Sequence, residues 1–213
     1  RELTVMLLVD VSNSLDFGTV KQLKKNMVAE IAATLAFSAI QNNDKIGVIF
    51  FSDRIEKFIP PKKGRKHILY IIRELLDFKP ESTRTNIQCA IEYLTNVLKK
   101  RCTAFMLSDF IDDRDFQNAL TIANRKHDVV ALQVYDRRLE ELPDVGLMKV
   151  RDAETGHEPW IDTSAKSLRK THHEWWKSRQ QKLHEIFTHS NVDAVSVRTD
   201  QDYVKALLNL FAK

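Results

Sequence analysis

Cysteine, proline and glycine are all scarce in this sequence, whose 213 residues include two Cys, 5 Pro and 5 Gly. So little Gly and Pro, together with 43% hydrophobic residues, excludes collagen-like, low-complexity and disordered classes. Two cysteines are too few for a disulfide framework, so Cys89 and Cys102 are predicted to be reduced, structural thiols. The longest apolar runs, 5–9 and 46–51, are strand-sized and far shorter than the roughly 18 to 20 residues of a membrane helix. We therefore expect a soluble stretch of chain with no membrane contact of its own.

Charge of one sign is not concentrated in any long segment. Lys and Arg total 33 against 29 Asp and Glu, so the formal net charge is +4, and basic residues stand among acidic ones. The densest basic cluster, at 62–67, fits a solvated loop and helix start better than a polyanion site. The sequence therefore predicts no nucleic-acid partner.

What the sequence does contain is an alternation of short apolar runs with longer stretches of helical period. This alternation is typical of an α/β fold with a mainly parallel sheet. Strands are predicted at 3–9, 45–51, 103–107, 128–135 and 194–197. Helices are predicted at 19–40, 65–76, 86–98, 114–124, 167–189 and 201–211. The fold class that follows is a doubly wound α/β sheet with helices on both faces.

Two segments depart from this rhythm. Residues 45–51 and 54–59 predict a hairpin whose second strand is a short antiparallel edge strand, stopped by Pro60 and Pro61. Residues 136–163 predict a small hairpin insertion, and Thr199 or Asp200 is expected to cap the last helix. We expect one domain over residues 1–213, with upstream sequence missing because the chain starts without an initiator Met.

Oxygen-bearing side chains stand out at three places, two directly after predicted strands and one in a loop before a helix. The first strand ends in Asp10-Val11-Ser12-Asn13-Ser14, and the 103–107 strand ends in Ser108-Asp109-Phe110. A third set, at 83–86, precedes a predicted helix. Ligands of open parallel sheets bind at the carboxyl ends of the strands, so these places are the candidate site.

The residue types suit a hard cation. Mg²⁺ takes oxygen ligands in near-octahedral geometry, keeps several waters and typically uses only one or two carboxylates. If the hydroxyls bind directly while Asp10 and Asp109 act partly through water, the ion keeps much of its positive charge. An acidic side chain of a protein partner would then complete its shell, which is recognition without turnover.

The pattern D-x-S-x-S after the first strand, a downstream Thr and a later Asp resembles the metal-ion-dependent adhesion site of von Willebrand factor A domains. Carried over, this resemblance implies a sheet of that Rossmann-like type. It also implies a metal shell of Asp10, Ser12, Ser14, Thr85 and Asp109. Thr83 is the competing choice for the threonine. Mg²⁺ is the expected ion, with Mn²⁺ and Ca²⁺ as alternatives.

Four further stretches, 1–5, 107–110, 142–146 and 199–203, resemble the bacterial proteins called domain of unknown function family 58. This resemblance implies an association with MoxR-type AAA+ ATPases, and it implies that the chain is the C-terminal piece of a longer protein. The location it implies is cytoplasmic, or membrane-associated through the missing upstream sequence. Many relatives have glycines where Ser82, Thr83 and Arg84 stand here.

The main alternative is a Mg²⁺-dependent phosphohydrolase or phosphotransferase with Asp10 as nucleophile. Such enzymes typically need a second carboxylate two residues later, where this chain has Ser12. A zinc protease motif around His173 and Glu174 fails because position 177 is Lys177. We therefore predict a binding module and not an enzyme. The neighbouring pair at 175–176 predicts core or interface tryptophans.

Overall fold

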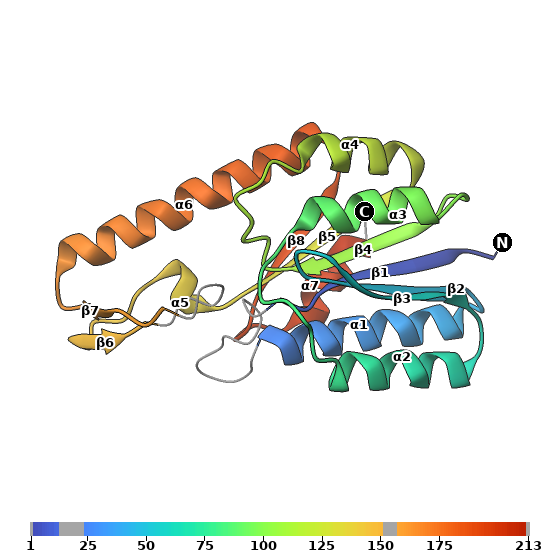
Figure 1. Cartoon of the computed structure of the whole chain (residues 1–213), viewed down its shortest axis with the longest axis horizontal. Helices are drawn as coiled ribbons and strands as arrows, with labels where there is room; N and C mark the ends of the chain where they lie inside the picture. The colour runs from blue at the N-terminus through green and yellow to red at the C-terminus, as the bar shows by residue number, and fades with distance from the viewer. Residues whose placement is uncertain (1, 13–23, 151–156, 212–213) are drawn as a thin grey trace.

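The computed structural model describes residues 2–12, 24–150 and 157–211, and its centre is a six-stranded sheet (Figure 1). Its strands are β1 (Thr4–Asp10), β2 (Lys45–Phe51), β3 (Ile55–Lys62), β4 (Thr103–Ser108), β5 (Asp128–Tyr135) and β8 (Asp193–Arg198). A separate two-stranded sheet pairs β6 (Leu147–Lys149) with β7 (Trp160–Asp162). The helices are α1 (Lys24–Gln41), α2 (Arg65–Asp77), α3 (Ile87–Val97), α4 (Gln117–Lys126), α5 (Arg137–Glu140), α6 (Lys166–His189) and α7 (Tyr203–Phe211).

The strand order of the large sheet is β3-β2-β1-β4-β5-β8. Every neighbouring pair is parallel except β2 with β3, which is antiparallel. The predicted fold class is confirmed, including the antiparallel edge strand and the small two-stranded excursion. Because the order reverses between β1 and β4, the carboxyl ends of these two strands form the topological switch point at which such sheets bind ligands.

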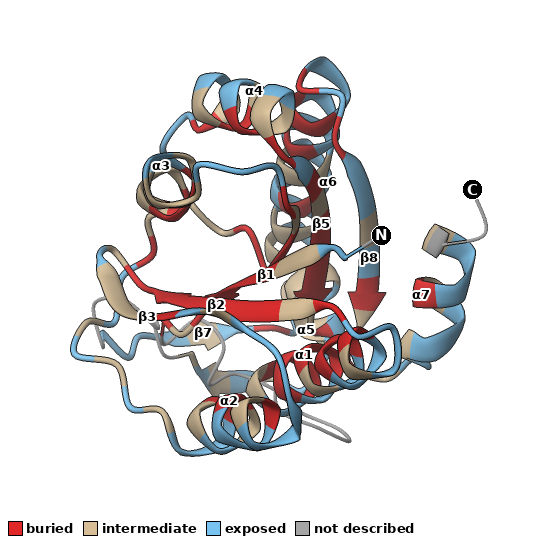
Figure 2. Cartoon of the chain, turned by 90° about the vertical axis from the view of Figure 1, so that its right-hand side faces the viewer, coloured by how far each residue is buried: buried red, intermediate tan, exposed pale blue. Residues whose placement is uncertain are grey.

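The core lies in two layers, one on each face of the sheet. Alternate residues of β1 show this division, because Leu7 packs in the layer with α1 and α2, whereas Met6 and Leu8 pack in the layer with α3, α4 and α6. Figure 2 shows the buried strands between these helices, with α7 beside the edge strand β8. None of the helices in the described part of the chain combines the length and apolar character needed to cross a membrane.

Three details of the sequence prediction were wrong. Strand β3 runs on through Pro60 and Pro61 to Lys62, because an edge strand tolerates residues that donate no ladder hydrogen bond. Helix α4 begins three residues late, at Gln117, where the Asp115 carboxylate accepts from the Gln117 N–H. The short helix α5 was not predicted.

The cap of α7 also differs from the prediction. The Asp202 carboxylate accepts from the Val204 N–H at 2.9 Å and so caps the helix, whereas Thr199 and Asp200 have other partners. The Thr199 hydroxyl donates to Asp136, and Asp200 pairs with Arg198. Both residues therefore hold the end of β8 to its surroundings.

The two adjacent tryptophans of α6 have different environments. Trp176 is 5% exposed and lies 5.2 Å from the Tyr135 ring, centroid to centroid. Trp175 is 41% exposed, with the Arg179 guanidinium 5.7 Å from its ring centroid. The first anchors α6 on the sheet and the second is a surface residue. Both cysteines are free thiols, as predicted.

Candidate metal-binding site at the carboxyl edge of the sheet

The candidate site begins where β1 and β4 end side by side. Val9 is paired with Leu107 across these strands, so Asp10 and Ser108 leave the sheet together. The Ser108 hydroxyl donates to Oδ2 of Asp10 at 2.5 Å, and the Ser12 N–H donates to Oδ1 of Asp10 at 2.9 Å. All three side chains are buried. The Asp10 carboxylate is thus fixed by two neutral donors.

The second carboxylate, Asp109, is held by a cation. The Lys24 ammonium donates to its Oδ2 at 2.7 Å, and the Ile111 N–H donates to its Oδ1 at 3.0 Å. Phe110, between them, has φ 56°, a left-handed conformation unusual for a bulky residue, and its N–H donates to the Ser108 hydroxyl. The strained turn therefore orders both sides of the site.

The loop between α2 and α3 brings Thr85 to the same place. Its hydroxyl donates to the Ser12 hydroxyl oxygen at 2.9 Å, and its side chain is 2% exposed. The Arg114 guanidinium donates to the Thr85 carbonyl at 2.6 Å, which fixes the loop. Thr83, the competing candidate, is exposed. Of the two threonines, Thr85 is the one that the fold directs into the site.

The environment of Asp10 opposes its ionisation. Burial and the charge of Asp109 raise its pKa from 3.8 to about 6, although the hydrogen bonds from Ser108 and Ser12 act in the opposite direction. Asp109 directly follows Ser108, whose hydroxyl donates to Asp10, so the two carboxylates lie at neighbouring strand ends. Two neighbouring buried carboxylates are an environment that a cation stabilises.

Four of the five predicted ligands therefore come together: Asp10, Ser12, Thr85 and Asp109. The fifth, Ser14, lies outside the described residues. The donor set is made of hydroxyl and carboxylate oxygens, which fits Mg²⁺, Mn²⁺ or Ca²⁺. Within the described ranges no three His, Cys, Asp or Glu side chains gather at one point, so a metal here would depend on hydroxyl ligands.

Sequence reasoning missed two residues of this site. Ser108 lies in the quoted strand end, but its bond to Asp10 joins positions 98 apart in the chain. Lys24 lies on the same face of α1 as the buried Met27 and Val28, three and four residues later. A lysine on the apolar face of an amphipathic helix was the pattern that could have revealed it.

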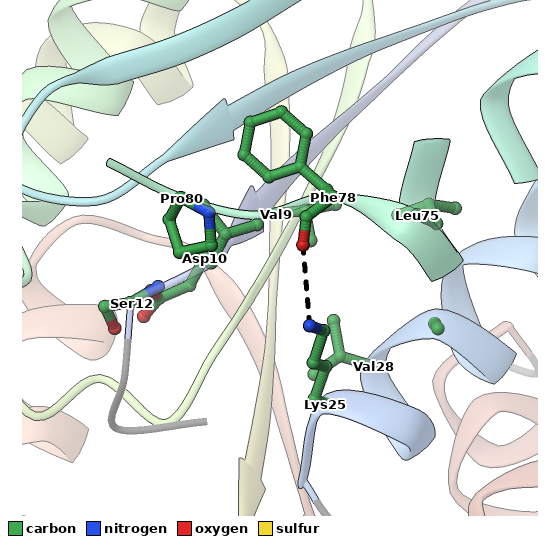
Figure 3. Close-up of a pocket in the computed structure, with 10 residues that line it drawn as sticks. Val9, Asp10, Ser12, Lys25, Val28, Leu75, Phe78 and Pro80 are labelled. Carbon is green, nitrogen blue, oxygen red and sulfur yellow. Dashed lines mark hydrogen bonds between the residues drawn. The ribbon is translucent and has the colours of Figure 1, made fainter. Parts of the chain in front are cut away.

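A small cavity of about 30 Å³ adjoins the site beneath the end of α2 (Figure 3). Asp10 and Ser12 lie on one side of it, and the Lys25 ammonium approaches the Phe78 carbonyl on another. Its other lining residues are mainly apolar: Val9, Val11, Val28, Ala29, Leu75 and Pro80. A space of this size holds one or two waters, so this cavity does not accommodate a nucleotide.

The mainly parallel six-stranded sheet with its antiparallel edge strand is the von Willebrand A-like fold that the sequence predicted. The chain belongs to the family described as protein of unknown function DUF58, whose model matches residues 1–182. An uncharacterised protein of Mycobacterium tuberculosis is 32% identical over 158 residues, which cover 73% of this chain and 50% of that protein. The chain thus spans about half the length of the curated relatives it matches.

Two solved structures share the fold along nearly the whole chain. BatB, a conserved hypothetical protein from Bacteroides thetaiotaomicron, has a TM-score of 0.66 at 18% identity, covering 99% of this chain and 97% of that one. An aerotolerance-related membrane protein from Bacteroides fragilis, crystallised with multiple mutations to serine, has a TM-score of 0.66 at 17% identity. That match covers 99% of this chain and 100% of the other. At these identities the likeness concerns the fold.

Proposed function

We propose that the carboxyl edge between β1 and β4 holds a divalent metal ion that captures an acidic side chain of a protein partner. The proposed shell is Asp10, Ser12, Ser14, Thr85 and Asp109, with Mg²⁺ as the ion and Mn²⁺ or Ca²⁺ as alternatives. The observation that carries this proposal is that all four oxygens of the two carboxylates already accept a hydrogen bond or ion pair from the protein.

In this arrangement the carboxylate ligands and the hydroxyl ligands would hold the ion in different ways. Carboxylates occupied by protein donors act through water, and the hydroxyls of Ser12 and Thr85 bind directly as neutral ligands. When bound, the ion would supply a coordination position and keep much of its positive charge. An acidic side chain from a partner fits that position better than a neutral one does, because the contact is between opposite charges.

Recognition explains the site better than phosphoryl transfer by Asp10. A nucleophile needs a carboxylate oxygen that is free to attack, but both oxygens of Asp10 accept hydrogen bonds from the protein. The position two residues later holds Ser12, which cannot serve as the acidic partner of such a nucleophile. We therefore expect no hydrolysis of p-nitrophenyl phosphate above a metal-only blank.

The partner and the location remain part of the proposal. The family resemblance supports a MoxR-type AAA+ ATPase, or a protein assembled with one, as the partner that offers Asp or Glu. A cytoplasmic location, with membrane association through sequence outside this chain, stays a prediction. The membrane association is supported by the membrane protein among the structures that share the fold.

The test is a titration of the chain with Mn²⁺, followed by water-proton relaxation. We expect a saturable enhancement, because an ion bound at this edge keeps exchangeable water, and we expect Asp10→Ala to abolish it. Asp136→Asn is the matched control, because Asp136 is another buried carboxylate at a strand end, bonded to the Arg138 N–H and the Thr199 hydroxyl. Equal enhancement in wild type and Asp10→Ala would refute the proposed site.

The same assay distinguishes the two candidate threonines. Thr85→Val removes the hydroxyl that donates to Ser12 but keeps the side-chain shape, and we expect at least a tenfold weaker Mn²⁺ affinity. Thr83→Val, on the exposed part of the loop, is expected to bind as the wild type does. The opposite result would make Thr83 the ligand.

A further inference from the structure

Lys24 is the most unusual charged residue of the described chain. It is the first residue of α1, its side chain is 1% exposed, and its ammonium lies 2.7 Å from a carboxylate that is 0% exposed. Lysine is almost never fully buried unless it is paired, and a buried ion pair contributes little net stability because both charges lose their hydration. The position of Lys24 therefore calls for a role beyond holding the fold together.

The charges of three groups indicate that role. The described part of the site brings together two carboxylates, those of Asp10 and Asp109, and one ammonium group, that of Lys24. A divalent ion added to these three groups leaves one positive charge in a buried place. Without Lys24, the same ion would neutralise the two carboxylates completely. The lysine thus decides whether the loaded site has charge left for an external anion.

We propose that the fixed positive charge of Lys24 weakens metal binding when no external carboxylate is bound. The metal affinity of the site then depends on a carboxylate supplied by a partner. This inference rests on the function proposed above and adds the regulation of the same site. A buried net positive charge is unfavourable, so the metal-bound form is disfavoured until an anion arrives. By thermodynamic reciprocity, the carboxylate raises the metal affinity by the factor by which the metal raises the carboxylate affinity.

The test compares Mn²⁺ affinity at pH 7.5, with and without acetate at constant ionic strength, in wild type and Lys24→Gln. Glutamine keeps a polar side chain with hydrogen-bond donors but carries no charge. We expect Lys24→Gln to bind Mn²⁺ at least tenfold more tightly without acetate and to lose the strengthening that acetate gives the wild type. A tenfold change corresponds to about 1.4 kcal/mol.

Two variants serve as controls. Lys25→Gln removes the neighbouring lysine, whose ammonium approaches the Phe78 carbonyl, and it should leave both the affinity and the acetate effect unchanged. Lys24→Met provides a second uncharged side chain if the glutamine variant does not fold, as judged by circular dichroism. Binding is followed by relaxation of water protons, with a blank for Mn²⁺ and acetate alone.

Each outcome decides something different. Wild-type binding with no change in a folded Lys24→Gln would overturn the role of Lys24 and leave the proposed metal site intact. Binding of Mn²⁺ without acetate that is at least tenfold tighter in Lys24→Gln than in the wild type, with an acetate effect in the wild type alone, would support the inference. Absence of binding in both proteins, with and without acetate, would overturn the inference and the proposed function together.

Discussion

Replacement of Asp10 by Asn should stabilise the metal-free protein at alkaline pH. The pKa of Asp10 rises from 3.8 to about 6 on folding, because of burial and the charge of Asp109, so the folded state binds the proton more tightly than the unfolded state. Ionised Asp10 therefore costs stability, and the cost grows between pH 3.8 and about 6 and is complete above that range. This difference in pKa corresponds to about 3 kcal/mol.

Asparagine removes this cost but keeps the local hydrogen bonds. Its carbonyl oxygen accepts from the Ser12 N–H as Oδ1 does now, and its amide nitrogen faces the Ser108 hydroxyl oxygen, which can accept. We expect Asp10→Asn to be about 3 kcal/mol more stable than wild type at pH 8 in EDTA. Most of this gain should disappear by pH 4, because wild-type Asp10 is then protonated in the folded protein.

Urea unfolding of both proteins at pH 4 and pH 8 measures this difference, and comparison of the two proteins cancels the titration of all other groups. Asp136→Asn, at the end of β5, controls for the loss of a negative charge. Equal stability of wild type and Asp10→Asn at pH 8, or a difference that does not depend on pH, would refute the reasoning. The variant should also lose the stabilisation that Mn²⁺ gives the wild type.

Three further predictions test the packing and burial of residues within the fold. Trp176→Ala should cost about 3 to 5 kcal/mol in urea unfolding because it empties a buried site, whereas Trp175→Ala should cost less than about 1 kcal/mol. Gly47→Ala should lower the melting temperature, because its Cβ would lie 2.7 Å from a backbone oxygen of β3 and 2.8 Å from the Met6 sulfur. Burial raises the pKa of Cys102 to about 12, so a thiol reagent such as DTNB should label it at pH 8 only after unfolding.

The position of the candidate site could be predicted from the sequence because it follows from strand order. Continuous apolar runs marked β1 and β4, and each run is followed at once by an oxygen-bearing residue. Parallel strands that neighbour each other bring their carboxyl ends together, so Asp10 and Asp109 could be expected to meet although 98 residues separate them. Thr85 does not follow from strand order, because its loop joins α2 to α3; the resemblance to the adhesion site is what singled it out.

The supporting contacts could not be predicted in this way. The ion pair of Lys24 with Asp109 joins residues 85 positions apart, and hydrophobic periodicity carries no information on which buried polar groups will pair. Pro60 and Pro61 donate no backbone hydrogen bond, and they fit within β3 only because this strand lies at the edge of the sheet. Asp202 caps α7 because of the local turn, which a search for Thr or Asp near the helix start does not resolve.

The two carboxylates of the site are treated differently by the fold, and this difference is its most informative property. Asp109 is neutralised by Lys24, whereas Asp10 is held by neutral donors and keeps a raised pKa. A site selected for stability alone would pair both charges or bury apolar groups instead. With one carboxylate paired and the other destabilised, the site favours additional positive charge, because Lys24 balances only one of the two carboxylates. Under the proposed function, a divalent ion supplies more positive charge than the second carboxylate balances, and a partner's carboxylate restores the balance of charge.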